Sequence, residues 1–80
     1  MTDSAIAARI VNALEAAADR EVGAPTALVS VTLDVLKRAD AGAIAISVTR
    51  KTRTLVFMTA EFRNDGGERI VSASSVHKVL

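Results

Sequence analysis

The order of two hydrophobic periods along the chain most constrains its fold. Residues 4–20 have apolar side chains at helical spacing, and the chain from residue 29 to 80 alternates apolar and polar side chains with period two. Alternation of this kind turns one set of strand side chains toward a core and the other set away from it. The sequence therefore predicts an α+β domain, with one N-terminal helix followed by a four-stranded antiparallel sheet.

The predicted helix has clear boundaries and one apolar stripe. Thr2 or Asp3 is the candidate N-cap, and Gly23 followed by Pro25 is the stop signal. The stripe expected to face the sheet consists of Ile6, Ile10, Val11, Ala13, Leu14, Ala17 and Ala18. The opposite, polar face holds Arg9, Asn12, Glu15, Ala16 and Asp19.

The four predicted strands cover residues 27–36, 43–50, 54–63 and 69–79, and we expect consecutive strands to be neighbours in an uninterrupted meander. The side chains expected to point inward from the first three strands are Val29, Val31, Leu33, Val35, Ile44, Ile46, Val48, Val56, Met58, Ala60 and Phe62. Residues 64–67 read Asn-Asp-Gly-Gly, which is a strong hairpin signal because these residues tolerate positive φ.

The chain is short for a self-sufficient core. Its 80 residues allow one domain, which buries roughly 60% of the surface of the unfolded chain. There is no cysteine for a disulfide, and the single His77 cannot form a metal site of ordinary ligand spacing. We expect His77 to be a partly buried structural residue. Half of the residues are hydrophobic, so oligomerisation is the remaining way to cover apolar surface.

Charge and hydropathy exclude two classes of partner. The formal net charge is +1, the basic residues are spread along the chain and only two residues are aromatic, so we expect no nucleic-acid partner. No segment approaches the roughly 20 apolar residues that a membrane span needs, so we expect no membrane partner. These features predict a cytoplasmic protein.

Three stretches carry a resemblance to a known family. They are the strand and basic loop of residues 30–39, the basic turn of residues 50–55 and the hairpin of residues 64–73. Together with the preceding helix, they resemble hotdog-fold thioesterases of the phenylacetate-type acyl-CoA group. The resemblance implies that a curved sheet wraps the helix and that an acyl-CoA thioester is hydrolysed at the interface of a homodimer or larger even oligomer. The coenzyme A moiety would be part of the substrate, with no separate cofactor.

The resemblance also indicates where this chain departs from the family. Family members have a further helix and strands before the central helix, so we interpret residues 1–80 as a single, N-terminally truncated hotdog-like domain. The family's oxyanion-stabilising N–H would fall at Ser4 or Ala5, and its catalytic carboxylate would fall on Asn12. An amide cannot act as a general base, and Glu15 lies one turn later as a possible replacement.

The basic turn gives the candidate ligand site. Arg50, Lys51 and Arg53 would pair with the phosphates of coenzyme A, as the equivalent loop does in the family; the alternative is an ordinary solvated turn. Two functions stay open from the sequence. One is an acyl-CoA thioesterase, and the other is a catalytically inert hotdog module that dimerises and binds an acyl-CoA or a protein partner.

Overall fold

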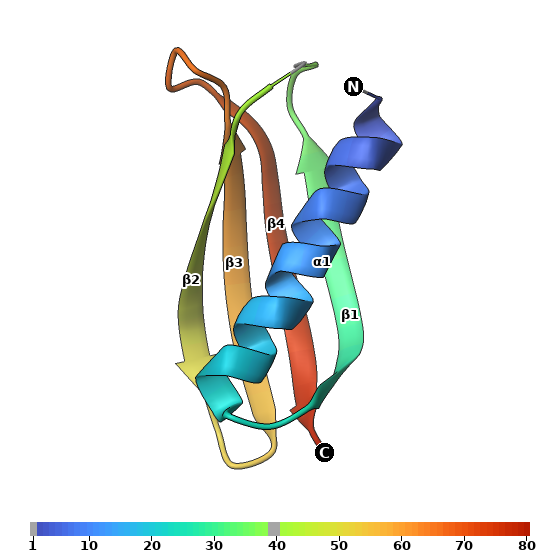
Figure 1. Ribbon diagram of the computed structural model, residues 1–80, viewed down its shortest axis with the longest axis vertical. Coiled ribbons are helices and arrows are strands. Elements are labelled where there is room, and N and C mark those ends of the chain that lie inside the picture. Colours follow the sequence, from blue (N-terminus) through green and yellow to red (C-terminus); the bar gives the residue numbers. More distant parts are fainter. Residues whose placement is uncertain (1, 39–40) are drawn as a thin grey trace.

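A computed structural model of the chain describes residues 2–38 and 41–80. It contains one helix and four strands: α1 (Asp3–Val22), β1 (Thr26–Val35), β2 (Ala43–Lys51), β3 (Leu55–Arg63) and β4 (Arg69–Val79). The strands form one antiparallel sheet, and α1 lies diagonally across one of its faces (Figure 1). The predicted α+β class, with one helix against a four-stranded antiparallel sheet, is confirmed. Among the described residues, no helix is long and apolar enough to cross a membrane.

Capping at both ends accounts for the boundaries of α1. The N-cap is Thr2, whose hydroxyl accepts a hydrogen bond from the N–H of Ala5, while Asp3 is already helical and favours the positive end of the helix dipole. At the other end, Gly23 adopts a left-handed φ of 76° and donates its N–H to the carbonyl of Asp19. The helix is thus slightly longer than predicted at both ends, and Thr2 is the N-cap of the two candidates.

The order of strands in the sheet is β1-β4-β3-β2, so the predicted uninterrupted meander is wrong for the first strand. β2, β3 and β4 are consecutive neighbours, but β1 pairs with β4 at the opposite side of the sheet from β2. Adjacency of consecutive strands is a preference that holds roughly two-thirds of the time. Here the two strands with the most buried residues, β3 and β4, occupy the centre of the sheet, and β1 and β2 become its edges.

The core lies between α1 and the sheet face beneath it, which we call the helix face. From α1, the buried side chains are Ile6, Ile10, Leu14, Ala17 and Ala18, as the apolar stripe predicts. From β3 and β4, the buried hydrophobic side chains are Val56, Met58, Ala60, Phe62, Ile70, Val71 and Ala73. The inward set predicted for the third strand is therefore confirmed.

A β-bulge changes the inward set of β1. The register shifts between Leu28 and Ser30, which leaves Val29 without a partner and 59% exposed. Val31 and Leu33 still pack against the core, as predicted, whereas the prediction for Val29 is wrong. A bulge inserts one residue into the strand, and a period-two pattern read from the sequence does not reveal it.

Two connections depend on glycine. In the hairpin between β3 and β4, Gly67 has a φ of 84°, and Asn64 accepts hydrogen bonds from the N–H groups of Gly67 and Glu68, which confirms the predicted turn. Before β2, a Cβ atom on Gly42 would lie 2.2 Å from the carbonyl oxygen of Arg63. Glycine is therefore required at residue 42 for the chain to pass close to β3.

Candidate functional site

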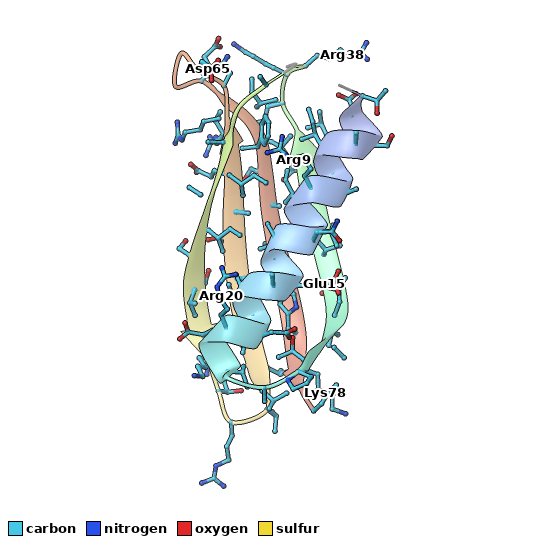
Figure 2. All side chains as sticks on the ribbon, viewed as in Figure 1. Arg9, Glu15, Arg20, Arg38, Asp65 and Lys78 are labelled. Carbon is cyan, nitrogen blue, oxygen red and sulfur yellow. The ribbon has the colours of Figure 1, made fainter. Side chains whose placement is uncertain are left out.

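The two candidate catalytic residues lie on the exposed side of α1. Asn12 and Glu15 are both exposed, and their spacing of three residues places them on neighbouring positions of one helix surface. Glu15 lies on the flank of α1 that faces β1 (Figure 2). Thus Glu15, the one carboxylate of this candidate pair, lies toward the edge of the sheet formed by β1.

Backbone N–H groups in the first turn of α1 are already engaged in hydrogen bonds to Thr2. The hydroxyl of Thr2 accepts the N–H of Ala5 at 3.2 Å, and the carbonyl of Thr2 accepts the N–H of Ile6 at 3.1 Å. One of the two N–H groups that the resemblance offers for an oxyanion, that of Ala5, is therefore engaged in capping. The carboxylate of Asp3 in the same turn adds a negative charge where an oxyanion donor would have to act.

Asp19 fixes the same flank of α1 to the start of β1, a role that the sequence analysis missed. One carboxylate oxygen of Asp19 accepts both the N–H of Thr26, at 2.8 Å, and its hydroxyl, at 2.6 Å. These two hydrogen bonds, the one from the hydroxyl first, lower the pKa of Asp19. An acidic residue in the last two turns of a helix, followed by a threonine at the start of the next strand, is the sequence signal for this contact.

His77 is fully buried on the helix face, more completely than predicted, together with Ser75. The Ser75 hydroxyl and His77 Nε2 are 2.7 Å apart, while Nδ1 of His77 has no hydrogen-bond partner among the described residues. Burial lowers the pKa of His77, and the charges of Glu15 and Asp19 act in the opposite direction. The neutral form of the imidazole is thus favoured. Full burial beneath α1 agrees with the structural role expected for His77.

The three candidate coenzyme A residues lie at the turn between β2 and β3, next to the C-terminal end of α1. Lys51 donates to the carbonyl of Glu21 at 3.0 Å, and its Nζ lies 4.0 Å from the Glu21 carboxylate. Arg50 is opposite Phe57 and Lys51 is opposite Val56, so their side chains start on different faces of the sheet. Arg53 is exposed in the turn itself.

The structure does not bring the two candidate groups together within this chain. Glu21, which Lys51 contacts, is nine residues after Asn12 on α1, a separation of about 13 Å along the helix axis. A ligand that used both groups of one chain would have to extend along α1.

The sheet face opposite α1, which we call the open face, carries a transverse row of hydroxyl groups. Strand pairing aligns Thr32, Ser74, Thr59 and Ser47 across the four strands, and the hydroxyls of Ser47 and Thr59 are 2.8 Å apart. A shallow hollow of about 320 Å³ lies beside this row over β2, β3 and β4.

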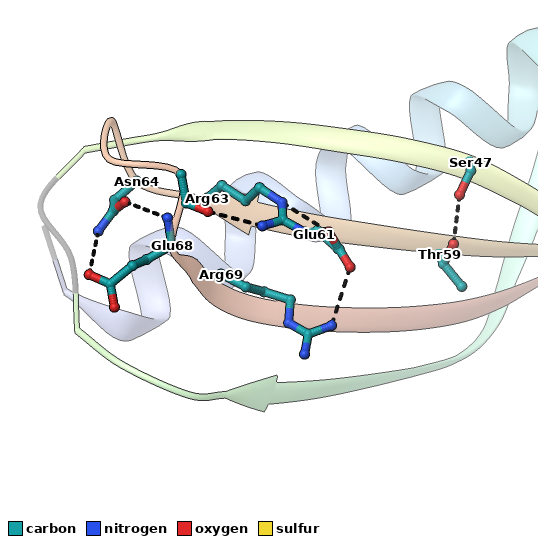
Figure 3. A network of polar contacts seen from close by, with 8 residues as sticks. Ser47, Thr59, Glu61, Arg63, Asn64, Glu68 and Arg69 are labelled. Atoms are coloured by element: carbon teal, nitrogen blue, oxygen red, sulfur yellow. Dashed lines mark hydrogen bonds and ion pairs between the residues drawn. The ribbon is translucent and has the colours of Figure 1, made fainter.

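Glu61 at the edge of this hollow is tied to two cations (Figure 3). Arg63 donates two hydrogen bonds to one of its oxygens, and Arg69 donates to the other at 3.3 Å. The hydrogen bond from Arg63 is the main cause that lowers the pKa of Glu61. With its charge engaged by two arginines, Glu61 is not poised to act as a general base.

Sequence comparison gives no identification. The chain matches no protein-family model, and no curated protein matches it.

Structural comparison, by contrast, finds strong similarity. A Bacillus halodurans protein crystallised with CoA superposes with a TM-score of 0.86 at 15% identity, covering 100% of this chain and 56% of that one. A protein of the thioesterase superfamily superposes with a TM-score of 0.71 at 15% identity, over 82% of this chain and 52% of its own. A phenylacetic acid degradation-related protein from Ralstonia eutropha, described as a thioesterase, gives a TM-score of 0.63 at 24% identity, over 71% and 44%.

This chain spans about half the length of each of these proteins. The similarity extends over all of α1 and the sheet in the first comparison, and it agrees with the resemblance drawn from residues 30–39, 50–55 and 64–73. At these identities the comparison establishes the fold. The chain has a hotdog fold, with one helix against a four-stranded antiparallel sheet.

Proposed function

We propose that this chain is an acyl-CoA thioesterase-like hotdog domain that binds acyl-CoA at a dimer interface and hydrolyses the thioester there if it is active. The observation that carries the proposal is the superposition of the entire chain on a protein crystallised with CoA. The proposal includes the cytoplasmic location expected from the sequence.

The proposed dimer would form along β1. β1 is an edge strand, and an unpaired edge offers backbone N–H and C=O groups for pairing with another strand. The exposed large hydrophobic residues at β1 and directly after it are Leu28, Val29, Val35 and Leu36. Pairing of β1 with its symmetry mate would cover these side chains and would bring the flank of α1 with Glu15 to the interface.

A second candidate function is supported by the residues at the family's catalytic positions. Asn12 cannot accept a proton from water as a carboxylate does, and Asp3 places a negative charge at the start of α1. These residues favour a catalytically inert hotdog module that dimerises and binds an acyl-CoA or a protein partner. The proposed dimer is common to both candidates, so only chemistry or ligand binding separates them.

The deciding experiment measures free thiol release from a panel of aromatic and aliphatic acyl-CoA thioesters. Turnover that saturates with one acyl class supports the thioesterase. Absence of thiol release from every thioester, by a protein that is folded and dimeric, supports the inert module.

CoA binding is tested separately by calorimetry. If Arg50, Lys51 and Arg53 hold the phosphates, affinity for CoA should fall as the ionic strength rises, and Arg53→Gln should weaken binding. Arg69→Gln is the control, because Arg69 begins β4 at the opposite end of the sheet from the turn between β2 and β3 (Figure 1). If calorimetry detects no CoA binding at low ionic strength, the basic turn is not a CoA site.

A further inference from the structure

One buried polar atom beneath α1 has no partner. His77 is fully buried, and its Nε2 lies 2.7 Å from the hydroxyl oxygen of Ser75, while Nδ1 of the same ring has no hydrogen-bond partner in the part of the chain that the structure describes. A neutral imidazole has one donor nitrogen and one acceptor nitrogen, so Nδ1 is unsatisfied in either tautomer. An unsatisfied buried group disfavours the closed structure, because water would satisfy it in an open one.

Strand pairing places His77 next to the contact between Asp19 of α1 and Thr26 of β1, which we call the α1–β1 junction. His77 is opposite Leu28 in the ladder between β4 and β1, and Thr26 comes two residues before Leu28, so all three side chains start on the helix face. Asp19 accepts the N–H of Thr26 at 2.8 Å and its hydroxyl at 2.6 Å. Because Asp19 is exposed, the junction can open while the rest of the core stays closed.

Two carboxylates of α1 act on the imidazole of His77. Burial has the larger effect and lowers the pKa of His77, while the charges of Glu15 and Asp19, one helical turn apart, oppose that effect. Both carboxylates belong to exposed residues, whereas the ring is fully buried. A protonated ring therefore gains a carboxylate or water as its partner only if α1 and the sheet separate at this end.

The sheet offers a protonated His77 no carboxylate. The neighbours of His77 on the helix face are Leu28 of β1 and Val56 of β3, which are both apolar. On β2, Lys51 starts in the same row, and its Nζ is hydrogen-bonded to the last turn of α1. The next residue of β4, Lys78, points to the open face. A positive charge on His77 is thus disfavoured in the closed structure from the side of all four strands.

We propose that His77 is a pH sensor for the α1–β1 junction, which opens locally when the ring takes up a proton while the other end of the sheet stays closed. In the open state, water or a carboxylate of α1 satisfies the charged ring, and Asp19 releases Thr26. Histidine suits this role because it is the side chain whose charge ordinarily changes just below neutral pH. The inference concerns contacts within one chain, so it does not depend on dimer formation or on acyl-CoA chemistry.

Hydrogen exchange of single amides, followed by NMR between pH 5 and 7, tests the proposal. The N–H of Thr26 reports on the junction, and the N–H of Phe62, opposite Val71 at the other end of the sheet, reports on global opening. After correction for intrinsic exchange, Thr26 should open more often than Phe62 at every pH. Its opening should also increase by up to about tenfold per pH unit below about pH 6.5, because the open state binds a proton that the closed state does not.

Two variants assign this pH dependence to the ring. His77→Gln has no titrating group at this position, so opening at Thr26 should no longer depend on pH in this range. Ser75→Ala is the matched control, because it removes the hydrogen bond but keeps the titrating ring, and it should retain the pH dependence. The proposal is overturned if Thr26 and Phe62 open equally often, if opening at Thr26 does not depend on pH, or if His77→Gln behaves as the wild type does.

The wild-type protein alone provides a second measurement if a variant does not fold. His77 is the single histidine of the chain, so the imidazole signals in an NMR titration belong to it. The midpoint of the ring titration should lie below the ordinary histidine value, and the amide signal of Thr26 should shift with the same midpoint. A ring that titrates while the Thr26 amide signal stays constant would also overturn the proposal.

Discussion

Ser75 and His77 share a hydrogen bond of 2.7 Å between the serine hydroxyl and Nε2, and both side chains are buried beneath α1. The two residues are two positions apart on β4, so they point to the same face of the sheet. A polar pair thus lies on the helix face beside Ala73, where the rest of the buried set is apolar. The imidazole is held neutral by burial, which lowers the pKa of His77.

This burial predicts that the protein loses stability as the pH falls from neutral. Below the ordinary histidine pKa of about 6.5, the unfolded chain binds a proton that the native state does not, because the pKa of His77 is lowered in the native state. The free energy of unfolding should therefore decrease by up to about 1.4 kcal/mol per pH unit until His77 itself becomes protonated.

Urea unfolding between pH 5 and 8 measures this effect, with His77→Gln as the comparison. Glutamine keeps a hydrogen-bonding group near Ser75 and does not titrate, so the variant should show a flatter profile above pH 5. Asp19, Glu61 and Glu68, whose pKa values are also lowered in the native state, add to the loss of stability toward pH 5 in both proteins, so the difference between the two profiles reports His77. Equal slopes for the two proteins would contradict the prediction.

Gly42→Ala should destabilise the protein by about 1–3 kcal/mol, the usual cost of overpacking. The added Cβ would lie 2.2 Å from the carbonyl oxygen of Arg63 and 2.8 Å from a ring carbon of Phe62, so the backbone would have to move. Gly66→Ala is the matched control, since its Cβ would be 3.5 Å from the nearest atom, the side-chain oxygen of Asn64. Chemical denaturation of both variants is the measurement, and similar stabilities would refute the close approach at Gly42.

A double substitution on β1, Val29→Lys with Val35→Lys, should convert the proposed dimer into an 8.4 kDa monomer. Both valines are about half exposed in the single chain, so the change should be tolerated in the monomer, while two charges per protomer would oppose burial in an interface. Light scattering at micromolar concentration measures the mass. The variant Val48→Lys, on the other edge strand, is the control and should remain dimeric. A measured mass of 8.4 kDa for the wild-type protein would contradict the dimer proposal.

Asn12→Asp should raise the rate of acyl-CoA hydrolysis if Asn12 occupies the position of the family's carboxylate. General-base assistance is worth about 10²–10⁴-fold, and the exposed helix surface at residue 12 accommodates the isosteric change. Thiol release by wild type and variant is compared on the same thioesters.

Glu15→Gln provides the control for this assignment. If the wild type already hydrolyses acyl-CoA rapidly and Asn12→Asp has no effect, then loss of activity in Glu15→Gln would identify Glu15 as the catalytic carboxylate. If no variant releases thiol, the inert module is the better description.

Local patterns along the chain are enough to predict one helix and four strands close to their observed bounds. Period-two alternation fixed Val56, Met58, Ala60 and Phe62 as core residues, because alternation is a local property of an extended chain. The stripe that begins with Ile6 fixed the buried side of α1 for the same reason. The resemblance carried by residues 30–39, 50–55 and 64–73 was also enough to identify the fold.

Tertiary structure decided which strands are neighbours and what the edges expose. The pairing of β1 with β4 joins segments far apart in the chain, and local pattern does not encode it. The bulge at Val29 and the close approach at Gly42 are both relations between elements. They arise from packing of side chains and backbone in space, which is why the alternation of the sequence does not predict them.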